Sequence, residues 1–524
     1  MYAEVPHKFE AGTVNAGGAV GLEAAIHYIA QIGFDRIQQR EEYLSTLMLE
    51  GIKKIPHVHL LGADTPEQHH GIFSFTVDDV HPHDVSAILA DAGIAVRAGH
   101  HCAQPLLQHL GVNATTRASL AFYNTEEIID EQLNAGKSLA DARHGGSSGC
   151  VETGCWGYEA YPLTGYFNLP KILEVTLNNG VDPRSGKMIG IETGDPRDFE
   201  TFEELFDAYK KQVKYFEDVK VNGSNINTQL TAKYNPVPYM SLLTEDCIAR
   251  GEDYNAGGAR YNTTYLQGVG IGSITDALSS LKYNVYDEKR FTMDELLEAI
   301  GHNFEGEKYQ LIRNLVSRKT PKFGNDDDYA DDIMRAVFRY FHDTITGRPN
   351  MRRGEWRIDM LPTTCHVYFG EVMNASPNGR LAHKPVSEGI SPEKGADIYG
   401  PTGVINSCAK MDQLSTGGTL LNQKFTPSVL AGDTGLDQFA NLIRAYFNMD
   451  GHHIQFNVID RKTLLAAQAN PEEYKDLIVR VAGYSDHFRN LSKELQDEII
   501  NRTEQSFDDY SDADSEYPKD GCGC

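Results

Sequence analysis

The stretch RVAGYSDHF, from Arg480 to Phe488, decides how the larger part of this chain folds. It is the last of five motifs that follow one another along the sequence. The earlier four are GCVETG at Gly149–Gly154, YNAGGARYN at Tyr254–Asn262, ASPNGR at Ala375–Arg380 and SEGISP at Ser387–Pro392. One short motif is weak evidence for a fold, whereas five in order are strong evidence. The chain from the first motif to the last is therefore interpreted as one structural region.

Between these motifs the sequence alternates helical and extended patterns. Apolar residues recur at helical spacing over Phe202–Phe216 and Met293–Ile300, and His453–Ile459 has the pattern of a strand. Glycine clusters at Asn255–Arg260 and Tyr265–Gly272 indicate close backbone approach or positive φ. This alternation is typical of the α/β class, and we expect an α/β barrel.

Composition limits the class of protein. With 524 residues, 40% hydrophobic and 23% charged, the chain can bury sizeable cores and suits about two to four domains. No apolar run approaches the roughly 18 residues of a membrane span, and the start MYAEVPHKFEAG lacks signal-peptide features, so we expect a cytoplasmic protein. Eight scattered cysteines do not suggest a disulfide framework. The formal charge of −26 excludes nucleic acid as the main partner.

Together the five motifs resemble the dehydratase branch of the glycyl radical enzymes. GCVETG followed by AYPLTGYFNLPKILE at Ala160–Glu174 is most similar to the trans-4-hydroxy-L-proline dehydratases of that branch. Choline lyases, glycerol dehydratases and sulfonate lyases remain alternative relatives. The resemblance implies the C-terminal half of the family's α/β barrel and a lyase that removes water from a small molecule. It also implies anaerobic chemistry and a separate radical S-adenosylmethionine activating enzyme as partner.

The resemblance assigns the radical chemistry to three residues. Gly483 would store a radical on its Cα, where no side chain prevents planarity, and Cys150 would exchange a hydrogen atom with it, because the two bonds are close in strength. The Cys150 thiyl would then take hydrogen from the carbon next to the leaving hydroxyl group, while Glu152 transfers a proton. Such a site must be dry. The alternatives are a buried structural thiol and an ordinary glycine at a helix start.

Substrate-binding residues are expected near the cysteine motif and in LPTTCHVYFG. Thr363, Thr364 and His366 stand where the family lines its pocket, but a Pro-Thr-Thr turn before a strand is an equally good interpretation. Tyr166 either contacts substrate or packs, and packing is favoured. Cys155 lacks the preceding glycine and the glutamate two places on, so it is not expected to be the radical thiol.

The first 132 residues have a different pattern. Ala19–Gln31 and Phe34–Ile55 show helical spacing, whereas Gly71–Val77 and Gly93–Arg97 are short and rich in β-forming residues. The two β-rich segments are bounded by glycine or charged turns. A small α+β domain is therefore expected.

Three stretches of this domain, FEAGTVN, VRAGHHCAQP and TTRASLAFYNTEEI, resemble the C-terminal domain of a cysteine desulfurase of the iron–sulfur assembly type, a fold of aminotransferase class V. The resemblance implies that Cys102 carries sulfur as a persulfide, Arg117 holds the substrate carboxylate and Thr13 reaches the cofactor phosphate of a partner subunit. The lysine and large domain that bind pyridoxal phosphate would have to come from that partner. Adjacent His100 and His101 cannot easily share a tetrahedral ion, so no metal is expected.

The two resemblances abut without a spacer. Residues 136–149 already resemble the approach to the radical cysteine loop, although GGSSG by composition suggests a linker. We therefore predict two truncated domains, 1–132 and 133–507, and expect poor stability or no dehydration. Persulfide transfer through Cys102 and a catalytically silent fusion, real or an artefact of assembly, are the alternatives.

The C-terminal tail, residues 508–524, is acidic and poor in apolar residues, so we expect it to be disordered. Cys522 and Cys524 provide at most half of a zinc site. The oligomeric state is left open, with a homodimer as one option.

Overall fold

A computed structural model describes residues 33–63, 65–69, 71–91, 96–99, 101, 104–119, 127–147 and 150–507. The chain divides into two compact units, Met1–Glu126 and Glu127–Cys524. No helix among the described residues is long and apolar enough to cross a membrane. Thr13, His100, Cys102 and the acidic tail lie outside the described residues, so what was predicted for them stays a prediction.

The first unit is a small α+β domain, as predicted. Its antiparallel sheet has the order β1-β2-β4-β3, and Phe73 and Phe75 on β2 share a buried cluster with Leu49 and Ile52 on α2. The elements are α2 (Phe34–Ile52), β1 (Val58–Leu61), η2 (Pro66–Gln68), β2 (Ile72–Val77), α3 (Pro82–Asp91), β3 (Arg97–Gly99), α4 (Gln104–His109) and β4 (Thr115–Ser119).

Two of the predicted elements in this unit differ from the structure at their ends. The helix predicted over Phe34–Ile55 ends at Ile52, followed by turns. Of the strand predicted over Gly93–Arg97, only residues 96 and 97 are described; Arg97 begins β3, and pairing with β4 extends β3 to Gly99, which lies opposite Thr115. Tertiary pairing therefore places this strand, which the local apolar pattern could not do.

The second unit contains two parallel sheets of three strands. One has the order β13-β12-β8, formed by Trp356–Asp359, Thr264–Val269 and Leu163–Asn168. The other has the order β15-β14-β18, formed by Ile454–Val458, Leu421–Phe425 and Glu504–Gln505. A parallel bridge between Met360 and Thr419 links the end of β13 to the approach to β14. Together the strands form part of the wall of the α/β barrel that was predicted.

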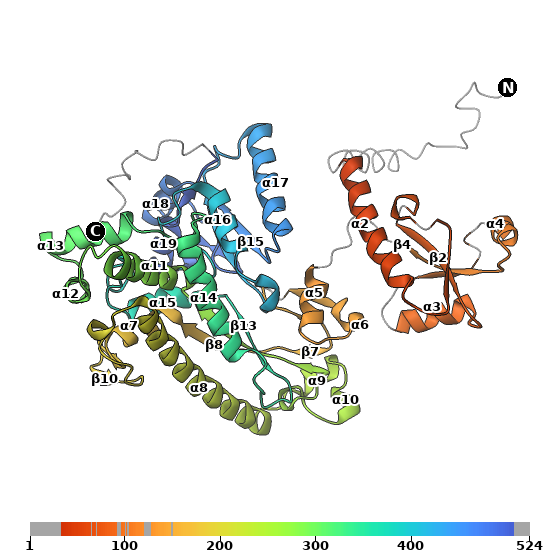
Figure 1. Cartoon of the computed structure of the whole chain (residues 1–524), viewed down its shortest axis with the longest axis horizontal. Coiled ribbons are helices and arrows are strands. Elements are labelled where there is room, and N and C mark those ends of the chain that lie inside the picture. The colour runs from red at the N-terminus through yellow and green to blue at the C-terminus, as the bar shows by residue number, and fades with distance from the viewer. Residues whose placement is uncertain are drawn as a thin grey trace. The chain divides into compact units, whose positions relative to one another are not determined.

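Helices cover the outer face of this wall. Helix α11 (Ile271–Leu281) packs on α14 (Asp328–Ile345) and on α7 (Leu169–Leu177), and α8 (Phe202–Tyr234) packs on α7 and α14 (Figure 1). The other helices are α5 (Glu127–Asn134), α6 (Leu139–Ala142), α9 (Pro238–Leu243), α10 (Cys247–Arg250), α12 (Met293–Gly301), α13 (Glu307–Arg318), α15 (Cys365–Glu371), α16 (Gly400–Ala409), α17 (Gly432–Asn448), α18 (Arg461–Ala469) and α19 (Lys493–Ile500). Short elements are β5 (Gly145–Ser147), β6 (Thr153–Cys155), β7 (Glu159–Ala160), β9 (Val181–Asp182), β10 (Lys187–Met188), η3 (Pro196–Asp198), η4 (Tyr254–Ala256), β11 (Tyr261–Asn262), η5 (Lys282–Asp287), η6 (Gln413–Ser415), β16 (Ile478–Arg480), β17 (Ser485–His487) and η7 (Phe488–Asn490).

Side chains along β12 and β13 alternate between the helices and the barrel interior, as side chains of a strand must. Gly268 faces outward, because a Cβ there would lie 2.7 Å from the Met360 sulfur and 2.9 Å from a ring carbon of Phe341 on α14. Gln267 and Asp359, each next to an outward residue, therefore face inward. The interior face of this sheet carries polar side chains, whereas its outer face belongs to the hydrophobic core.

Several predicted elements of the second unit are confirmed. The helix predicted from Phe202 is α8, which begins at a capping box of Thr201 and Glu204, and the helix predicted from Met293 is α12. The strand predicted at His453–Ile459 is β15. The interpretation of LPTTCHVYFG as a turn before a strand is wrong: its second half forms helix α15, with Thr364 at the N-cap position.

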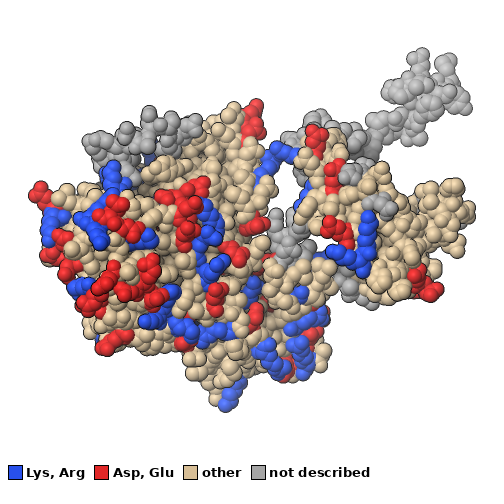
Figure 2. Space-filling model, in the orientation of Figure 1, with Lys and Arg blue, Asp and Glu red and all other residues tan. Residues whose placement is uncertain are grey.

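Charged side chains of both signs alternate over the face of the second unit that Figure 2 shows. Many of them pair, as Lys410 does with Asp326, Asp328 and Asp331 at 2.7 to 2.8 Å. The excess of acidic residues is thus partly offset locally.

Candidate active site

The cysteine of GCVETG lies at the tip of a small hairpin. Strands β5 and β6 pair antiparallel, with Ser147 opposite Thr153, and Cys150 lies in the turn between them. The hairpin is fixed to the barrel because the Thr153 backbone N–H donates to the Gly417 carbonyl at 2.9 Å. Residues 145–147 of the stretch GGSSG form a paired strand, so these three residues are not the flexible linker that composition suggests.

The close packing of this hairpin requires glycine at position 418. A Cβ on Gly418, whose φ is +138°, would lie 2.5 Å from the Val151 carbonyl oxygen. Val151 is buried in one cluster with Leu361, Leu420 and Ala482, and Cys150 packs against this cluster. The loop that carries Cys150 and the loop that contains Gly483 thus share a small apolar core.

Gly483 lies in the turn of a second hairpin, between β16 and β17, and not at a helix start. Its φ is +83°, a conformation that residues with a side chain rarely adopt. A Cβ at this position would lie 2.7 Å from Cys150 Cβ and 2.8 Å from Cys150 Sγ. One Cα–H bond of Gly483 therefore points directly at the thiol, and no side chain fits between them.

A network of polar side chains holds the glycine loop. The Gly483 N–H donates to Gln455 Oε1 at 3.2 Å, and the Arg480 Nη2 donates to the same oxygen at 2.8 Å. Arg502 donates to the Val481 carbonyl at 2.8 Å and pairs with Glu498 at 2.9 Å. The sequence analysis missed Gln455, because its strand looked like an ordinary strand and nothing local links it to residue 483.

The environment of Cys150 keeps its thiol protonated. Burial raises its pKa, the charge of Glu152 raises it further, and Arg480 opposes both effects. A thiolate attacks as a nucleophile, whereas only an S–H group can give a hydrogen atom to a carbon radical. The raised pKa of Cys150 therefore suits hydrogen-atom exchange better than nucleophilic chemistry.

Two buried carboxyl groups lie near this thiol. Glu152 is 2% exposed and Asp359, the last residue of β13, is fully buried. The pKa of Asp359 is raised well above its usual value, first by burial and then by the charge of Glu152. Glu152 was predicted from the sequence, whereas Asp359 was not, because its strand Trp356–Asp359 carries no recognisable motif.

Tyr166 and Thr363 come together beside the carboxyl groups. The Tyr166 hydroxyl donates to Thr363 Oγ1 at 2.8 Å, and Thr363 has the unusual positive φ of 48°. Burial raises the pKa of Tyr166, and so do the charges of Cys365, Asp359 and Glu152. Its ring packs on the cluster of Val269, Met373 and Val386, so the predicted packing role and a polar role are combined in one residue.

His366 lies in a different environment from Tyr166 and Thr363. It is fully buried, with Nε2 3.6 Å from Glu498 Oε1, and burial lowers its pKa. Glu498 also pairs with Arg502, which supports the glycine loop. These contacts favour a structural role for His366 behind the glycine loop over a contact with substrate.

Cys155 is buried one strand away from Cys150. Burial raises its pKa to about 12, and its sulfur lies 3.6 Å from Gln132 Oε1. The neighbouring Lys137 forms a buried ion pair with Glu159. These surroundings suit a buried thiol with a structural role, and the expectation that Cys155 is not the radical thiol stays a prediction.

Helix α5 belongs to the second unit although part of it was predicted in the first domain. Thr153 donates to Glu131 of α5, and His452 donates from Nε2 to the Val151 carbonyl at 3.0 Å, with Nδ1 3.8 Å from Glu131. Burial raises the pKa of Glu131. The structural boundary therefore lies between Glu126 and Glu127, before the predicted boundary at residue 132.

Of the residues predicted for sulfur transfer, the structure describes only Arg117. It lies on β4, directly opposite Arg97 on β3, and is half-buried. Cys102 and Thr13 lie outside the described residues. The described part of the first unit thus contains no assembled desulfurase site.

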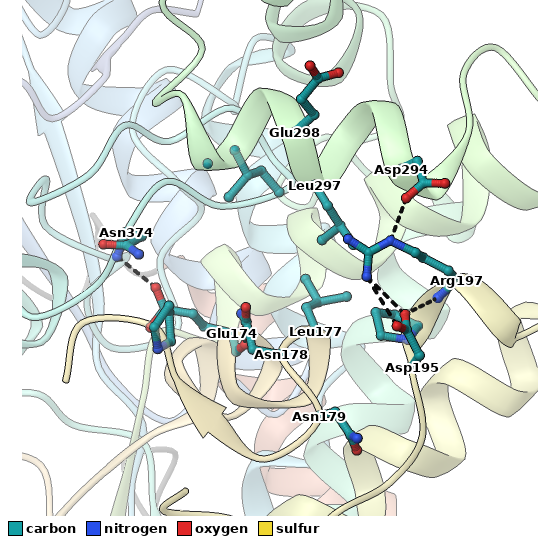
Figure 3. A pocket seen from close by; sticks show the side chains of 14 residues that line it. Glu174, Leu177, Asn178, Asn179, Asp195, Arg197, Asp294, Leu297, Glu298 and Asn374 are labelled. Atoms are coloured by element: carbon teal, nitrogen blue, oxygen red, sulfur yellow. Dashed lines mark hydrogen bonds and ion pairs between the residues drawn. The ribbon is translucent and has the colours of Figure 1, made fainter. Parts of the chain in front are cut away.

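A cavity of about 690 Å³ lies between α7, η3 and α12, on the outer helical layer (Figure 3). Its polar groups pair with one another: Arg197 pairs with Asp195 at 3.1 Å and with Asp294, and Glu174 accepts from the Asn374 backbone at 2.7 Å. Its lining includes none of the residues around Cys150 and Gly483. We therefore assign it no part in the chemistry.

Comparison with protein families gives three matches. The profile of the pyruvate formate lyase-like family matches residues 91–370, that of the glycine radical region matches residues 386–489, and that of aminotransferase class-V matches residues 1–131. The first covers more than half of the chain, and the second includes Gly483. The third covers the small α+β unit.

Individual proteins match in the same region. Trans-4-hydroxy-L-proline dehydratase from Clostridioides difficile is 66% identical over 387 residues, which are 74% of this chain and 49% of that protein. (2S)-3-sulfopropanediol dehydratase from Klebsiella oxytoca is 37% identical, over 74% of this chain and 47% of its own. This chain therefore spans about half the length of these relatives.

Solved structures are similar to the second unit. The structure of the Clostridioides difficile hydroxyproline dehydratase with trans-4-hydroxy-L-proline bound has a TM-score of 0.72 and 66% identity, and covers 74% of this chain and 48% of its own. The B12-independent glycerol dehydratase from Clostridium butyricum has a TM-score of 0.69 and 40% identity, over 73% and 48% of the two chains.

Proposed function

The chain belongs to the pyruvate formate lyase-like family, and from this premise we propose that it stores a radical on Gly483 and uses it, through Cys150, to remove water from a small hydroxylated molecule. One observation carries the proposal: the side-chain direction of Gly483 ends 2.8 Å from Cys150 Sγ. This contact is short enough for direct transfer of a hydrogen atom.

The two hairpins make this transfer reproducible. Gly483 is held by Gln455 through its N–H, and Cys150 by the bond of Thr153 to Gly417. One anchor, Gln455, lies on β15 and the other, Gly417, lies in the segment that leads into β14, so neither loop has to move for the hydrogen atom to pass. Rigid positioning of reacting atoms is a large part of catalysis in general.

Loss of water needs proton transfer as well as hydrogen-atom transfer. Cys150 takes a hydrogen atom from the carbon next to the one that bears the hydroxyl group, and Glu152, buried two residues away, moves a proton as the hydroxyl group leaves. The hydrogen atom then returns from the Cys150 thiol to the product. Tyr166 and Thr363, joined by their hydrogen bond, are proposed to contact the substrate.

The proposed substrate is trans-4-hydroxy-L-proline. The support is the 66% identity to the dehydratase that bears this name, against 37% to the sulfopropanediol dehydratase. A radical S-adenosylmethionine activating enzyme is the proposed partner that creates the radical on Gly483. The described cysteines, Cys150, Cys155, Cys247, Cys365 and Cys408, are all free thiols, which fits the anaerobic cytoplasm in which we place the reaction.

The test distinguishes hydrogen-atom exchange between Gly483 and Cys150, called the relay below, from turnover of the substrate. The full chain is activated without oxygen by such an enzyme and studied by electron paramagnetic resonance. The expected signal is split by the remaining α-hydrogen of Gly483, and the splitting disappears in D₂O because Cys150 exchanges its thiol hydrogen. C150S should keep the split signal in D₂O, and G483A should give no signal.

Each result decides a different part of the proposal. If the wild-type chain gives no radical signal under conditions that activate a known relative, radical storage on Gly483 is refuted. Loss of the splitting in C150S as well would refute the thiol as the exchange partner. Turnover is then measured with trans-4-hydroxy-L-proline, and L-proline, which lacks the hydroxyl group, serves as the control that cannot lose water.

A further inference from the structure

The residue that the proposed reaction does not yet use is Asp359. In the parallel sheet, Gln267 on β12 lies opposite Asp359 on β13 and opposite Tyr166 on β8. Residues opposite one another in a parallel ladder project to the same face. The three side chains therefore form one row across the interior face of the barrel wall, and one end of the row is the tyrosine beside Thr363.

Asp359 is buried without a partner. It is fully inaccessible to solvent, and neither of its carboxylate oxygens has a hydrogen-bond partner among the described residues. The amide nitrogen of Gln267, next to it in the row, lacks a partner among the described residues too. Buried polar groups in proteins are nearly always paired, so a carboxyl group and an amide left open side by side point to a ligand that binds there.

The neighbours of Asp359 are the residues of the reaction site. The titratable and charged groups that face it are Cys150 and Glu152 from the cysteine loop, Tyr265 from the neighbouring strand β12, Tyr166 from β8 beyond it, and Arg357 from its own strand. Arg357 is engaged by the Ser415 carbonyl at 3.3 Å. Burial and, after it, the charge of Glu152 raise the pKa of Asp359, which favours the protonated, neutral form of this carboxyl group.

We propose that Asp359 is a second catalytic carboxyl group, which holds a proton, donates it as a hydrogen bond to the substrate hydroxyl group, and transfers it when that group leaves. The inference deepens the proposed function and rests on it. Two buried carboxyl groups that face one site and share one proton are a common way to provide an acid and a base at the same pH. Glu152 is then the base of the pair.

Loss of water begins from the substrate radical that Cys150 creates. The C–O bond breaks heterolytically, its electron pair leaves with the oxygen, and the Asp359 proton completes a water molecule. Glu152 accepts a proton from the N–H or O–H group on the carbon that Cys150 attacked, so the substrate remains a neutral radical. The proton passes from Glu152 to Asp359, and the Cys150 thiol returns its hydrogen atom to the product radical.

The first experiment needs no radical. The infrared spectrum of the full chain at pH 7 should contain the C=O band of Asp359 as a neutral acid, and the difference between wild type and D359N should isolate that band. In E152Q this band should disappear at a pH about one unit or more lower than in wild type, because the like charge is gone. A difference spectrum without an acid band, or a midpoint that E152Q leaves in place, overturns the proposal.

Substrate contact is tested in the same spectra. Addition of trans-4-hydroxy-L-proline should shift the Asp359 band, because the acid then donates to the substrate hydroxyl group, whereas L-proline should leave the band in place. No shift with hydroxyproline, or the same shift with both compounds, overturns the contact. This readout does not depend on activation of the chain.

Turnover tests the proton transfer itself. In the activated chain, D359N should keep the radical signal and lower kcat by about 100-fold or more, the usual contribution of a general acid. The matched control is D276N, which removes another buried acid, one whose pKa is raised to about 7 beside Lys322 in the helical layer. D276N should keep both radical and kcat.

Two failures can be told apart. A wild-type chain without radical refutes the proposed function, and the infrared shift then still decides whether Asp359 is a neutral acid in contact with the hydroxyl group. A D359N chain with radical and with kcat within about threefold of wild type overturns the proton transfer while the proposed function stands.

Discussion

Replacing Gly483 by alanine should have two separable effects, one on radical storage and one on stability. The new Cβ would lie 2.7 Å from Cys150 Cβ and 2.8 Å from its sulfur, well inside normal contact distances. The loops must therefore separate, which costs about 1–3 kcal/mol for an overpacked core. The φ of +83° adds about 1–2 kcal/mol for a residue that has a Cβ. The free energy of unfolding should fall by about 2–5 kcal/mol in total.

Gly395 provides the matched control. It has a similar φ of +74°, but a Cβ there would have no neighbour within 4 Å. G395A should therefore lose only the backbone part, about 1–2 kcal/mol. The difference between the two variants measures the contact of residue 483 with Cys150, free of the cost of the conformation.

The assay is urea unfolding followed by tryptophan fluorescence. The chain has two tryptophans, Trp156 and Trp356, and both belong to the second unit, so the signal reports that unit alone. If G483A and G395A lower the free energy of unfolding by the same amount, Gly483 does not lie against Cys150. The contact on which hydrogen-atom exchange depends would then be absent. Electron paramagnetic resonance of the activated variants gives the second readout: G395A should keep the radical signal that G483A lacks.

Three other perturbations test the surroundings of the relay. Q455L removes the acceptor of the Gly483 N–H and should cost about 1–3 kcal/mol and reduce the radical yield, measured by unfolding and by spin counting. Alkylation of Cys150 by iodoacetamide should stay slow until the pH passes the ordinary thiol range, because burial and Glu152 raise its pKa, and E152Q should lower that pH; equal profiles would contradict the assigned cause. L230K on α8 should change the free energy of unfolding by less than about 0.5 kcal/mol, because Leu230 is 50% exposed, and a larger loss in urea unfolding would show that this side chain is packed.

Features that depend on neighbouring residues, such as the start of a helix, could be predicted from the sequence. Helix α8 begins where Thr201 and Glu204 form a capping box, and the apolar spacing that follows is visible without any tertiary information. Gly483 and Cys150 were predicted as a pair because their two motifs resemble those of the glycyl radical enzymes, and the chemistry explains why a glycine and a cysteine are needed. Their contact through the 2.7 and 2.8 Å approach is a property of the fold, but the motifs were enough to expect it.

Other parts of the site depend on strand register, which no local pattern contains. Asp359 enters the site because β13 pairs with β12 so that residue 359 lies opposite Gln267, and a shift of one residue would turn it to the helices. Gln455 reaches Gly483 across 28 positions of sequence, through the parallel pairing of β15 with β14. From the sequence alone, Asp359 and Gln455 are an acid and an amide in two strands that carry no motif.

The boundary between the two units also could not be placed from the sequence alone. A desulfurase-like pattern continues into residue 131, and the aminotransferase class-V profile ends there as well. Yet Glu131 accepts a hydrogen bond from Thr153, beside the loop that carries Cys150, and approaches His452 to 3.8 Å. The pyruvate formate lyase-like profile, over residues 91–370, overlaps the aminotransferase profile here, so the start of helix α5 matches both families by sequence while its packing belongs to the second unit. Packing around a buried carboxyl group, which requires partners, decides to which unit a segment belongs, and sequence similarity alone does not.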